Sequence, residues 1–148
     1  MAFFYDDEAV HLFNPPKDRV SYCNEWIQRQ LGRYKDNQLG LCALELLSTG
    51  DLIGMAGILS HEIDGQEEIE VGYHLLSKYW GNGYATEAAV FCKKFALENE
   101  LAENIISIIH LENQNSMRVA ERNGMKKLRE TKFRDFPVFI FSTQGAST

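Results

Sequence analysis

The sequence is poor in the features that mark disulfide-bonded scaffolds and membrane proteins. Its 148 residues include only three cysteines, Cys23, Cys42 and Cys92, which are isolated from one another. Because no CxxC spacing occurs, we expect reduced thiols, and we predict no metal site. No stretch approaches the ~20 apolar residues of a membrane span, and the start of the chain lacks the basic residues and apolar run of a secretory signal. These absences predict a cytoplasmic protein with no membrane partner.

The chain also has fewer basic than acidic residues. The formal net charge is −6, and the Lys and Arg residues are spread along the chain rather than clustered. A nucleic-acid partner requires a basic surface that neutralises phosphates, so we expect none. The length and the 45% of hydrophobic residues suit one globular domain, which we place at residues 1–148.

The hydrophobic pattern predicts helices and strands in a mixed order. After the turn and cap at Pro15 to Asp18, helical spacing predicts a helix ending near residues 32–35, with Cys23, Trp26, Ile27, Leu31 and Tyr34 on one face. A second helix begins near Ala85, and its buried face comprises Ala85, Ala88, Ala89, Cys92, Phe95 and Ala96. A short helix covers 116–122, and strands are expected at 41–47, 52–61, 68–76, 105–110 and 138–142. The result is an α/β domain with a mostly antiparallel sheet and one parallel crossover.

The most informative segment runs from Val71 to Ala89 and joins a strand, a glycine-rich turn and a helix. Gly81 and Gly83 allow a tight turn and close approach of the backbone to a ligand. The turn presents its N–H groups at a helix N-terminus, which favours an anion through unpaired donors and through the helix dipole. A GxG turn alone is weak evidence, because an ordinary strand-to-helix connection has the same pattern.

Two segments in the right order resemble one enzyme family. Residues 79–88 (YWGNGYATEA) are similar to the acyl-CoA-binding motif of the GCN5-related N-acetyltransferases (GNAT), in its RimJ/RimL-like form, and residues 112–125 (ENQNSMRVAERNGM) resemble the second signature of that family. The resemblance covers roughly residues 10–143. It implies a sheet splayed between the strands at 68–76 and 105–110, with acyl-CoA in the gap. Relative to the family, the first strand and helix are missing before Asp7 to Phe13, and the uncovered sheet edge favours a homodimer.

The resemblance implies acetyl-CoA as co-substrate and a set of residues that bind it. The loop amides would hold the pyrophosphate, the exposed strand edge and an asparagine would hold the pantetheine arm, and a strand amide would polarise the thioester carbonyl. The expected cofactor-binding residues are Leu75, Leu76, Gly81, Asn82, Gly83, Tyr84, Ala85, Thr86 and Asn113. Asn113 also has the position of an ordinary helix cap.

The catalytic residues are less sharply indicated. Glu70 lies where some relatives carry a catalytic glutamate, although a solvated strand carboxylate fits equally well. His74 is the competing base because imidazole titrates near neutrality. Alternation places Glu70 and His74 on one side of the sheet and Tyr73 on the other. Many relatives have a tyrosine acid where this chain has Ala120, and Ser116 is the remaining candidate, either as the hydroxyl near the sulfur or as a helix cap.

We therefore predict an acetyl-CoA-dependent N-acetyltransferase that acts on a primary amine, such as a protein N-terminus or a small molecule, by direct transfer in a ternary complex. A non-catalytic acyl-CoA-binding module of the same fold is the main alternative. A dinucleotide-dependent oxidoreductase is a weaker one, because the third glycine of its fingerprint is absent and only one βαβ unit is predicted.

Overall fold

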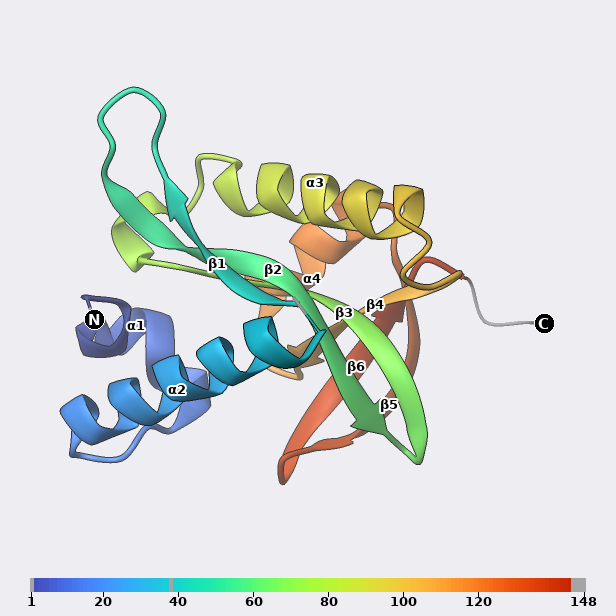
Figure 1. Cartoon of the computed structure of the whole chain (residues 1–148), viewed down its shortest axis with the longest axis horizontal. Coiled ribbons are helices and arrows are strands. Elements are labelled where there is room, and N and C mark those ends of the chain that lie inside the picture. Colours follow the sequence, from blue (N-terminus) through green and yellow to red (C-terminus); the bar gives the residue numbers. More distant parts are fainter. Residues whose placement is uncertain (1, 38, 145–148) are drawn as a thin grey trace.

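A single six-stranded sheet organises the chain. The computed structural model describes residues 2–37 and 39–144 (Figure 1). The strands are β1 (Gly40–Glu45), β2 (Leu52–Ile63), β3 (Gln66–Leu75), β4 (Ile105–His110), β5 (Lys126–Phe133) and β6 (Phe136–Ser142). Their order across the sheet is β1-β2-β3-β4-β6-β5. Only β3 and β4 pair in parallel, so the predicted mixed sheet with one parallel crossover is confirmed.

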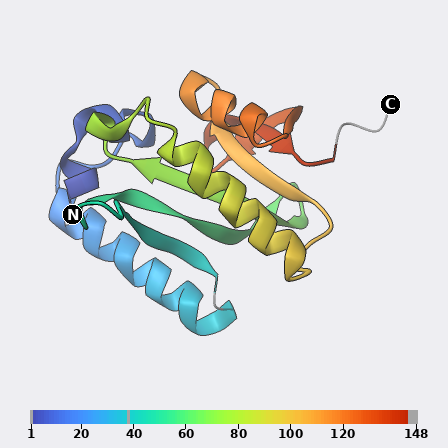
Figure 2. The ribbon, with the colours of Figure 1, turned by 90° about the horizontal axis from the view of Figure 1, so that it is seen from above.

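Helices cover both faces of this sheet. The chain begins with η1 (Ala2–Tyr5), α1 (Asp7–Val10), η2 (His11–Phe13) and α2 (Arg19–Asn37), and η3 (Ser77–Tyr79), α3 (Tyr84–Glu98) and α4 (Gln114–Arg122) follow. Figures 1 and 2 show α3 and α4 on one face, with α1 and α2 on the other. In the described residues, no helix combines the length and the apolar character needed to cross a bilayer.

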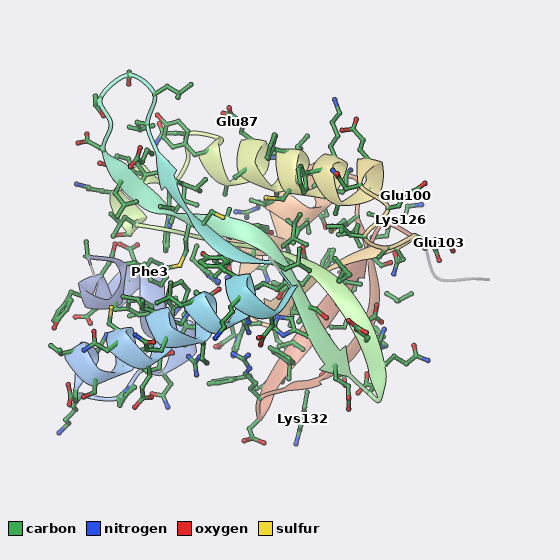
Figure 3. All side chains as sticks on the ribbon, viewed as in Figure 1. Phe3, Glu87, Glu100, Glu103, Lys126 and Lys132 are labelled. Atoms are coloured by element: carbon green, nitrogen blue, oxygen red, sulfur yellow. The ribbon has the colours of Figure 1, made fainter. Side chains whose placement is uncertain are left out.

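Each face buries its own hydrophobic cluster. Val71 and Ile105 of the sheet are almost fully buried beneath α3 and α4, and Ala96 is buried on the inner side of α3. On the opposite face, Phe3 and Cys23 pack against Leu41 and other residues of the first strands, and Figure 3 shows Phe3 between the start of the chain and the sheet. Burial of these side chains docks the N-terminal segment onto the sheet beside β3.

The buried faces of the two long helices agree only in part with those expected. In α3, Ala89, Cys92 and Ala96 are buried as predicted, but Phe95 is 45% exposed, so its assignment to the core is wrong. Its ring instead stacks on Phe91, with ring centroids 6.3 Å apart, on the outer side of the helix. Small residues let α3 lie close to the sheet, and the turn of the helix leaves Phe95 at the margin of the contact.

In α2 the expected face is also partly wrong. Cys23 is fully buried, whereas Leu31 is 51% exposed, and Ile27 and Tyr34 also lie at the surface. The buried position is taken by Gln30, whose Oε1 accepts a hydrogen bond of 3.0 Å from the Leu41 N–H of edge strand β1. A polar side chain is favoured there because it satisfies a buried main-chain donor.

The hairpin of β2 and β3 has a fixed register. Asp64 and Gly65 form its two-residue turn with φ of 52° and 80°, as a type I′ turn requires. The register pairs His61 with Glu68 and Leu59 with Glu70. Paired residues share a face of the sheet, so His61 and Glu70 lie diagonally adjacent on the same face.

The parallel pair separates soon after it forms. Strands β3 and β4 pair only at Ile69 with Ile105 and at Glu70 with Ile106, although both strands continue. At the point of separation the Ser107 hydroxyl donates a hydrogen bond of 2.9 Å to the Val71 carbonyl. The sheet therefore opens as a wedge whose closed end lies beside Glu70, and the splayed pair expected from the sequence is present.

Candidate functional site

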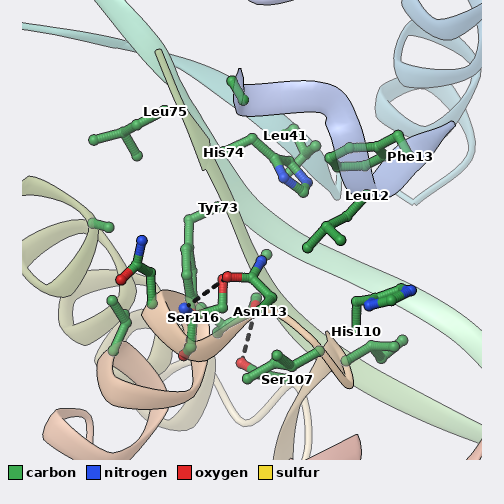
Figure 4. Close-up of a pocket in the computed structure, with 18 of the residues that line it drawn as sticks. Leu12, Phe13, Leu41, Tyr73, His74, Leu75, Ser107, His110, Asn113 and Ser116 are labelled. Carbon is green, nitrogen blue, oxygen red and sulfur yellow. Dashed lines mark hydrogen bonds between the residues drawn. The ribbon is translucent and has the colours of Figure 1, made fainter. Parts of the chain in front are cut away.

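A cleft of about 700 Å³ occupies the opening of the wedge. The first residues of the chain, α2, β3, β4, the glycine-rich loop, the start of α4 and the turn between β5 and β6 all contribute to its walls. Figure 4 shows His74 and Phe13 on one side of this cleft, with Tyr73, Ser116 and Asn113 on the other. Side chains from both faces of β3 reach the same space because the strand has no neighbour there.

The glycine-rich loop forms one end of the cleft. Gly81 and Gly83 have φ of 76° and 82°, a region that disfavours other residues, and Gly83 is the N-cap of α3. A Cβ added at either glycine would meet no atom within 4 Å, so the space next to the loop is open. Tyr84, Ala85 and Thr86 form the first turn of α3 and line the same space. Here the first amides of a helix face a cavity without a side-chain cap.

Side-chain hydrogen bonds hold the loop in place. The Trp80 Nε1–H donates to the Leu75 carbonyl at 3.0 Å, and the Asn82 side-chain amide donates to the carbonyls of Tyr79 and Trp80 at 3.0 and 3.1 Å. Trp80 thus ties the loop back to the end of β3, and Asn82 closes the turn. The loop is pre-organised before any ligand arrives, which lowers the entropic cost of binding.

The start of the chain is tied to the same region. The Asp6 carboxylate accepts hydrogen bonds from the Ser77 N–H at 2.7 Å and from the Ser77 hydroxyl, and it also caps α1 through Ala9. Burial acts to raise the pKa of Asp6, but the hydrogen bonds from Ser77 and from nearby backbone amides outweigh it, so the pKa lies below its ordinary value. Asp6 therefore joins the start of the chain to η3, the turn that leads into the glycine-rich loop.

The main chain of β3 offers donors on its open side. The Leu76 N–H donates to the Ile53 carbonyl at 2.9 Å, so this amide points towards β2 and is already used. Successive main-chain groups alternate between the two sides of a strand, so the Leu75 and Tyr73 amides face the opening. Of the two leucines expected to bind pantetheine through the main chain, Leu75 presents its amide to the cleft and Leu76 does not.

The start of α4 brings Asn113 and Ser116 to the cleft. Asn113 is the N-cap, and its Oδ1 accepts from the Ser116 N–H at 3.1 Å. The Asn113 side-chain amide and the Ser116 hydroxyl make no hydrogen bond within residues 2–37 and 39–144. The Tyr73 hydroxyl donates to the Ser116 carbonyl at 3.0 Å, and burial raises the pKa of this phenol, so it stays protonated. Asn113 is thus a helix cap with a spare donor facing the cleft.

Glu70 is paired at the closed end of the wedge. The carboxylate is buried, and its Oε2 lies 2.7 Å from Nε2 of His61, whose side chain is 8% exposed. The ring of His61 lies edge-on to Phe133, with centroids 4.9 Å apart. Glu70 is therefore not a solvated strand carboxylate but one member of a buried, hydrogen-bonded pair that lines the cleft.

His74 lies on the same face of β3 as Glu70 but in an apolar environment. Its ring contacts those of Phe3 and Phe13, with centroids 5.8 and 5.0 Å away. Burial lowers the pKa of His74 to about 4, although the charge of Glu70 acts in the opposite direction. The imidazole is therefore neutral at physiological pH, and its surroundings are those of a packing residue.

The lining residues that the sequence did not single out include His61, Arg33 and Arg134. His61 could have been found, because the two-residue turn at Asp64 and Gly65 fixes the register that places it beside Glu70. Arg33 from α2 and Arg134 from the turn between β5 and β6 meet only through the tertiary fold. In the described part of the chain no group of three or more His, Cys, Asp or Glu side chains could hold a metal ion.

Comparison with known sequences gives a family match over most of the chain. The family described as the acetyltransferase (GNAT) domain matches residues 1–126. A Bacillus subtilis protein, the uncharacterized protein YkkB, is 28% identical over 142 residues, which cover 96% of this chain and 82% of that protein.

Comparison with solved structures gives the same fold. An acetyltransferase from Agrobacterium tumefaciens superposes with a TM-score of 0.75 at 24% identity, covering 95% of this chain and 80% of the other. The aminoglycoside acetyltransferase AAC(6')-Ib, solved in complex with coenzyme A, superposes with a TM-score of 0.62 at 15% identity, covering 78% and 73%. At these identities the likeness concerns the fold.

Proposed function

Because the chain belongs to the GNAT acetyltransferase family, we propose that it transfers an acetyl group from acetyl-CoA to a primary amine within a ternary complex. The observation that carries the proposal is the wedge between β3 and β4, which has the open glycine-rich loop at one end and the Glu70–His61 pair at the other. We place the protein in the RimJ/RimL-like subgroup because of its YWGNGYATEA loop. The cytoplasmic location and the homodimer also remain predictions.

The cleft has the chemistry that binding of acetyl-CoA requires. The amides of Gly81, Asn82, Gly83, Tyr84, Ala85 and Thr86 would hold the diphosphate, since helix N-terminal amides favour anions. Arg118 and Arg122 also line the cleft, so positive charge accompanies the loop in a chain whose net charge is −6. The open space beside both glycines is the room that a close phosphate needs.

The pantetheine arm would lie along the open edge of β3. The Leu75 amide faces this edge and is the donor we assign to the arm or to the thioester carbonyl, where it would stabilise negative charge. The spare amide of Asn113 would donate to the arm from the other side of the wedge. Bound acetyl-CoA supplies the activated acetyl group, and the chain supplies its placement next to the amine.

Glu70 is the residue that we propose as the general base. A protonated amine must lose one proton before its nitrogen can attack the acetyl carbon, and Glu70 would accept that proton directly or through water. The attack breaks the C–S bond, and the second proton of the amine leaves with the thiol. His61 would orient the carboxylate of Glu70 and share the proton, because the two groups are hydrogen-bonded. His74 stays a packing residue in this proposal.

Ser116 is proposed to hydrogen-bond the sulfur rather than to act as a strong acid. Its hydroxyl is uncommitted in the described chain, but a neutral hydroxyl donates a proton poorly at its ordinary pKa. We therefore expect Ser116→Ala to lower turnover by less than ~10-fold, in contrast to a general acid, whose loss costs ~10²-fold or more.

One experiment separates the enzyme from the alternative, a non-catalytic acyl-CoA-binding module. The thermal midpoint of the purified protein is measured with acetyl-CoA, with NAD and with buffer, and thiol release is then followed across peptides, small amino acids, polyamines and aminoglycosides. The proposal predicts stabilisation by acetyl-CoA and thiol release with at least one amine class. Stabilisation without release for any amine would favour the binding module, and stabilisation by NAD alone would exclude both.

A further inference from the structure

Two arginines line the cleft on the side of the Glu70–His61 pair. Arg33 comes from α2 and Arg134 from the turn between β5 and β6, and both line the cleft together with Glu70 and His61. Figure 1 shows α2 on the face of the sheet opposite α3, and the turn between β5 and β6 at the bottom of the view, away from α3. Neither guanidinium makes a hydrogen bond or an ion pair with any residue in the ranges 2–37 and 39–144.

A chain of contacts connects Arg134 to the proposed base. The guanidinium of Arg134 lies over the ring of Phe133, 5.0 Å from its centroid, and that ring lies against His61. His61 is bonded to Glu70. Arg134 is therefore three contacts away from the carboxylate that would receive the proton of the amine.

The positive charge at this end is not neutralised by the protein. Burial lowers the pKa of Arg33 and of Arg134. The charge of Arg134 lowers the pKa of Arg33 further, and the charge of Arg29 does the same for Arg134. Glu70 acts in the opposite direction on both, but its carboxylate is bonded to His61. The other carboxylates that line the cleft are Glu8, which makes no ion pair in the described chain, and Glu112, which lies near His110. An arginine stays charged even so, and within the described residues neither Arg33 nor Arg134 has an ion-pair partner.

We propose that the acceptor is a small amine that also carries an oxyanion, a carboxylate or a phosphate, and that Arg33 and Arg134 bind this oxyanion while the amine faces Glu70. The assignment rests on the proposed acetyltransferase function and adds the substrate class. Guanidinium groups bind carboxylate and phosphate through paired, charge-assisted hydrogen bonds, which fix orientation as well as position. The same two charges repel a polycationic amine, so they select against polyamines.

The test compares amines that differ only in the anion. The pairs are leucine with leucinamide for a carboxylate, and phosphoethanolamine with ethanolamine for a phosphate, with spermidine as the polycation. Thiol release gives kcat/KM for each, and calorimetry gives the Kd of each for the protein saturated with coenzyme A. We expect the anionic member of at least one pair to be favoured by ~10-fold or more, the range of a lost charge-assisted pair. The pair that is favoured identifies the anion.

Variants assign the effect to the two arginines. Arg33→Gln and Arg134→Gln should each raise KM and Kd for the anionic amine by ~10-fold with an unchanged KM for acetyl-CoA. Lys35→Gln is the matched control, because Lys35 is exposed on the same helix and does not line the cleft. The double variant Arg33→Glu, Arg134→Glu should prefer spermidine. Retained stabilisation by acetyl-CoA verifies that each variant folds.

The outcomes distinguish this inference from the function on which it rests. Equal affinity for the anionic and neutral members of both pairs, or glutamine variants that bind the anionic amine like wild type, would overturn the inference even if acetyl transfer is observed. Binding of the anionic amine without thiol release would instead retain the arginine site and reject catalysis.

Discussion

Nε2 of His61 and Oε2 of Glu70 lie 2.7 Å apart at the closed end of the wedge between β3 and β4. The two side chains come from neighbouring strands and are both nearly excluded from solvent. A buried carboxylate needs such a partner, because leaving it unpaired costs free energy. The pair thus stabilises the buried carboxylate of Glu70 and, in the proposed reaction, would give it a route for a proton.

The first prediction concerns Glu70 itself. Glu70→Gln keeps the shape and a hydrogen bond to His61 but removes the base, so kcat should fall by ~10²-fold or more with little change in KM for acetyl-CoA. Glu67→Gln is the control, since Glu67 is exposed on the same strand and its carboxylate accepts a hydrogen bond from the Ser60 hydroxyl. Steady-state thiol release is the measurement, and a wild-type rate in Glu70→Gln would return the residue to a structural role.

The second prediction treats His61 as a positioning residue. In His61→Leu the carboxylate of Glu70 loses its donor, and we expect the free energy of unfolding to fall by ~1–3 kcal/mol and kcat by ~10-fold. The side-chain amide of Gln reaches a place similar to that of Nε2, so His61→Gln should recover most of the stability and part of kcat. Urea unfolding and thiol release check both, and equal behaviour of the two variants would argue against the hydrogen bond.

The third prediction separates backbone strain from ligand contact at Gly83. Gly83 and Gly65 have φ of 82° and 80°, and neither has an atom within 4 Å of an added Cβ, but Gly65 lies in the hairpin turn outside the cleft. Replacing either by Ala should cost a similar ~1 kcal/mol of stability. Only Gly83→Ala should weaken acetyl-CoA binding, by ~10-fold or more, as measured by calorimetry. Equal acetyl-CoA affinities in the two variants would contradict the loop assignment.

The fourth prediction follows from the low pKa of His74. The group titrates near 6.5 when unfolded and at about 4 when folded, so between these values the unfolded chain binds the extra proton. The contribution of His74 to the free energy of unfolding is therefore fully present above pH 6.5. It falls by roughly 3 kcal/mol as the pH drops towards 4. His74→Phe should remove that part of the pH dependence, whereas His11→Gln at an exposed site should keep it. Urea unfolding at pH 7 and pH 4.5 makes the comparison.

The fifth prediction concerns the thiols. Cys42 is exposed, whereas Cys23 and Cys92 are buried, and burial raises the pKa of Cys92 to about 11. At pH 8 the thiolate fraction of Cys92 is only ~10⁻³, so a thiol reagent should label one cysteine per native chain and three after denaturation. Cys42→Ser should abolish the native reaction. Rapid labelling of Cys92 in the native protein would contradict its place in the core.

Local patterns in the sequence were sufficient to predict the strands and the loop that surround the site. Continuous apolar residues predict β4, the Asp64-Gly65 turn predicts the β2–β3 hairpin, and Gly81 and Gly83 predict the open loop, because each depends on a few adjacent residues. The parting of β3 and β4 came from the family resemblance, since no local pattern specifies where a parallel ladder stops. The hydrogen bond from the Ser107 hydroxyl to the Val71 carbonyl lies where the two strands separate, and it is visible only in the folded structure.

What the sequence did not predict depends on contacts between distant segments. The exposure of Phe95 reflects how α3 lies on the sheet, and the burial of Gln30 reflects an unpaired amide on β1. Arg33 and Arg134 are about a hundred positions apart, and neither lies in a motif. Side chains that meet through packing in this way carry no spacing signal.

The hydrogen bond between Ser107 and Val71 also marks the depth of the wedge, because it lies at the narrow end beside Glu70. In the proposed reaction, an acyl group that enters from the loop would meet paired main chain there. We therefore expect the place where the two strands stop pairing to limit the length of the acyl chain that the wedge accepts.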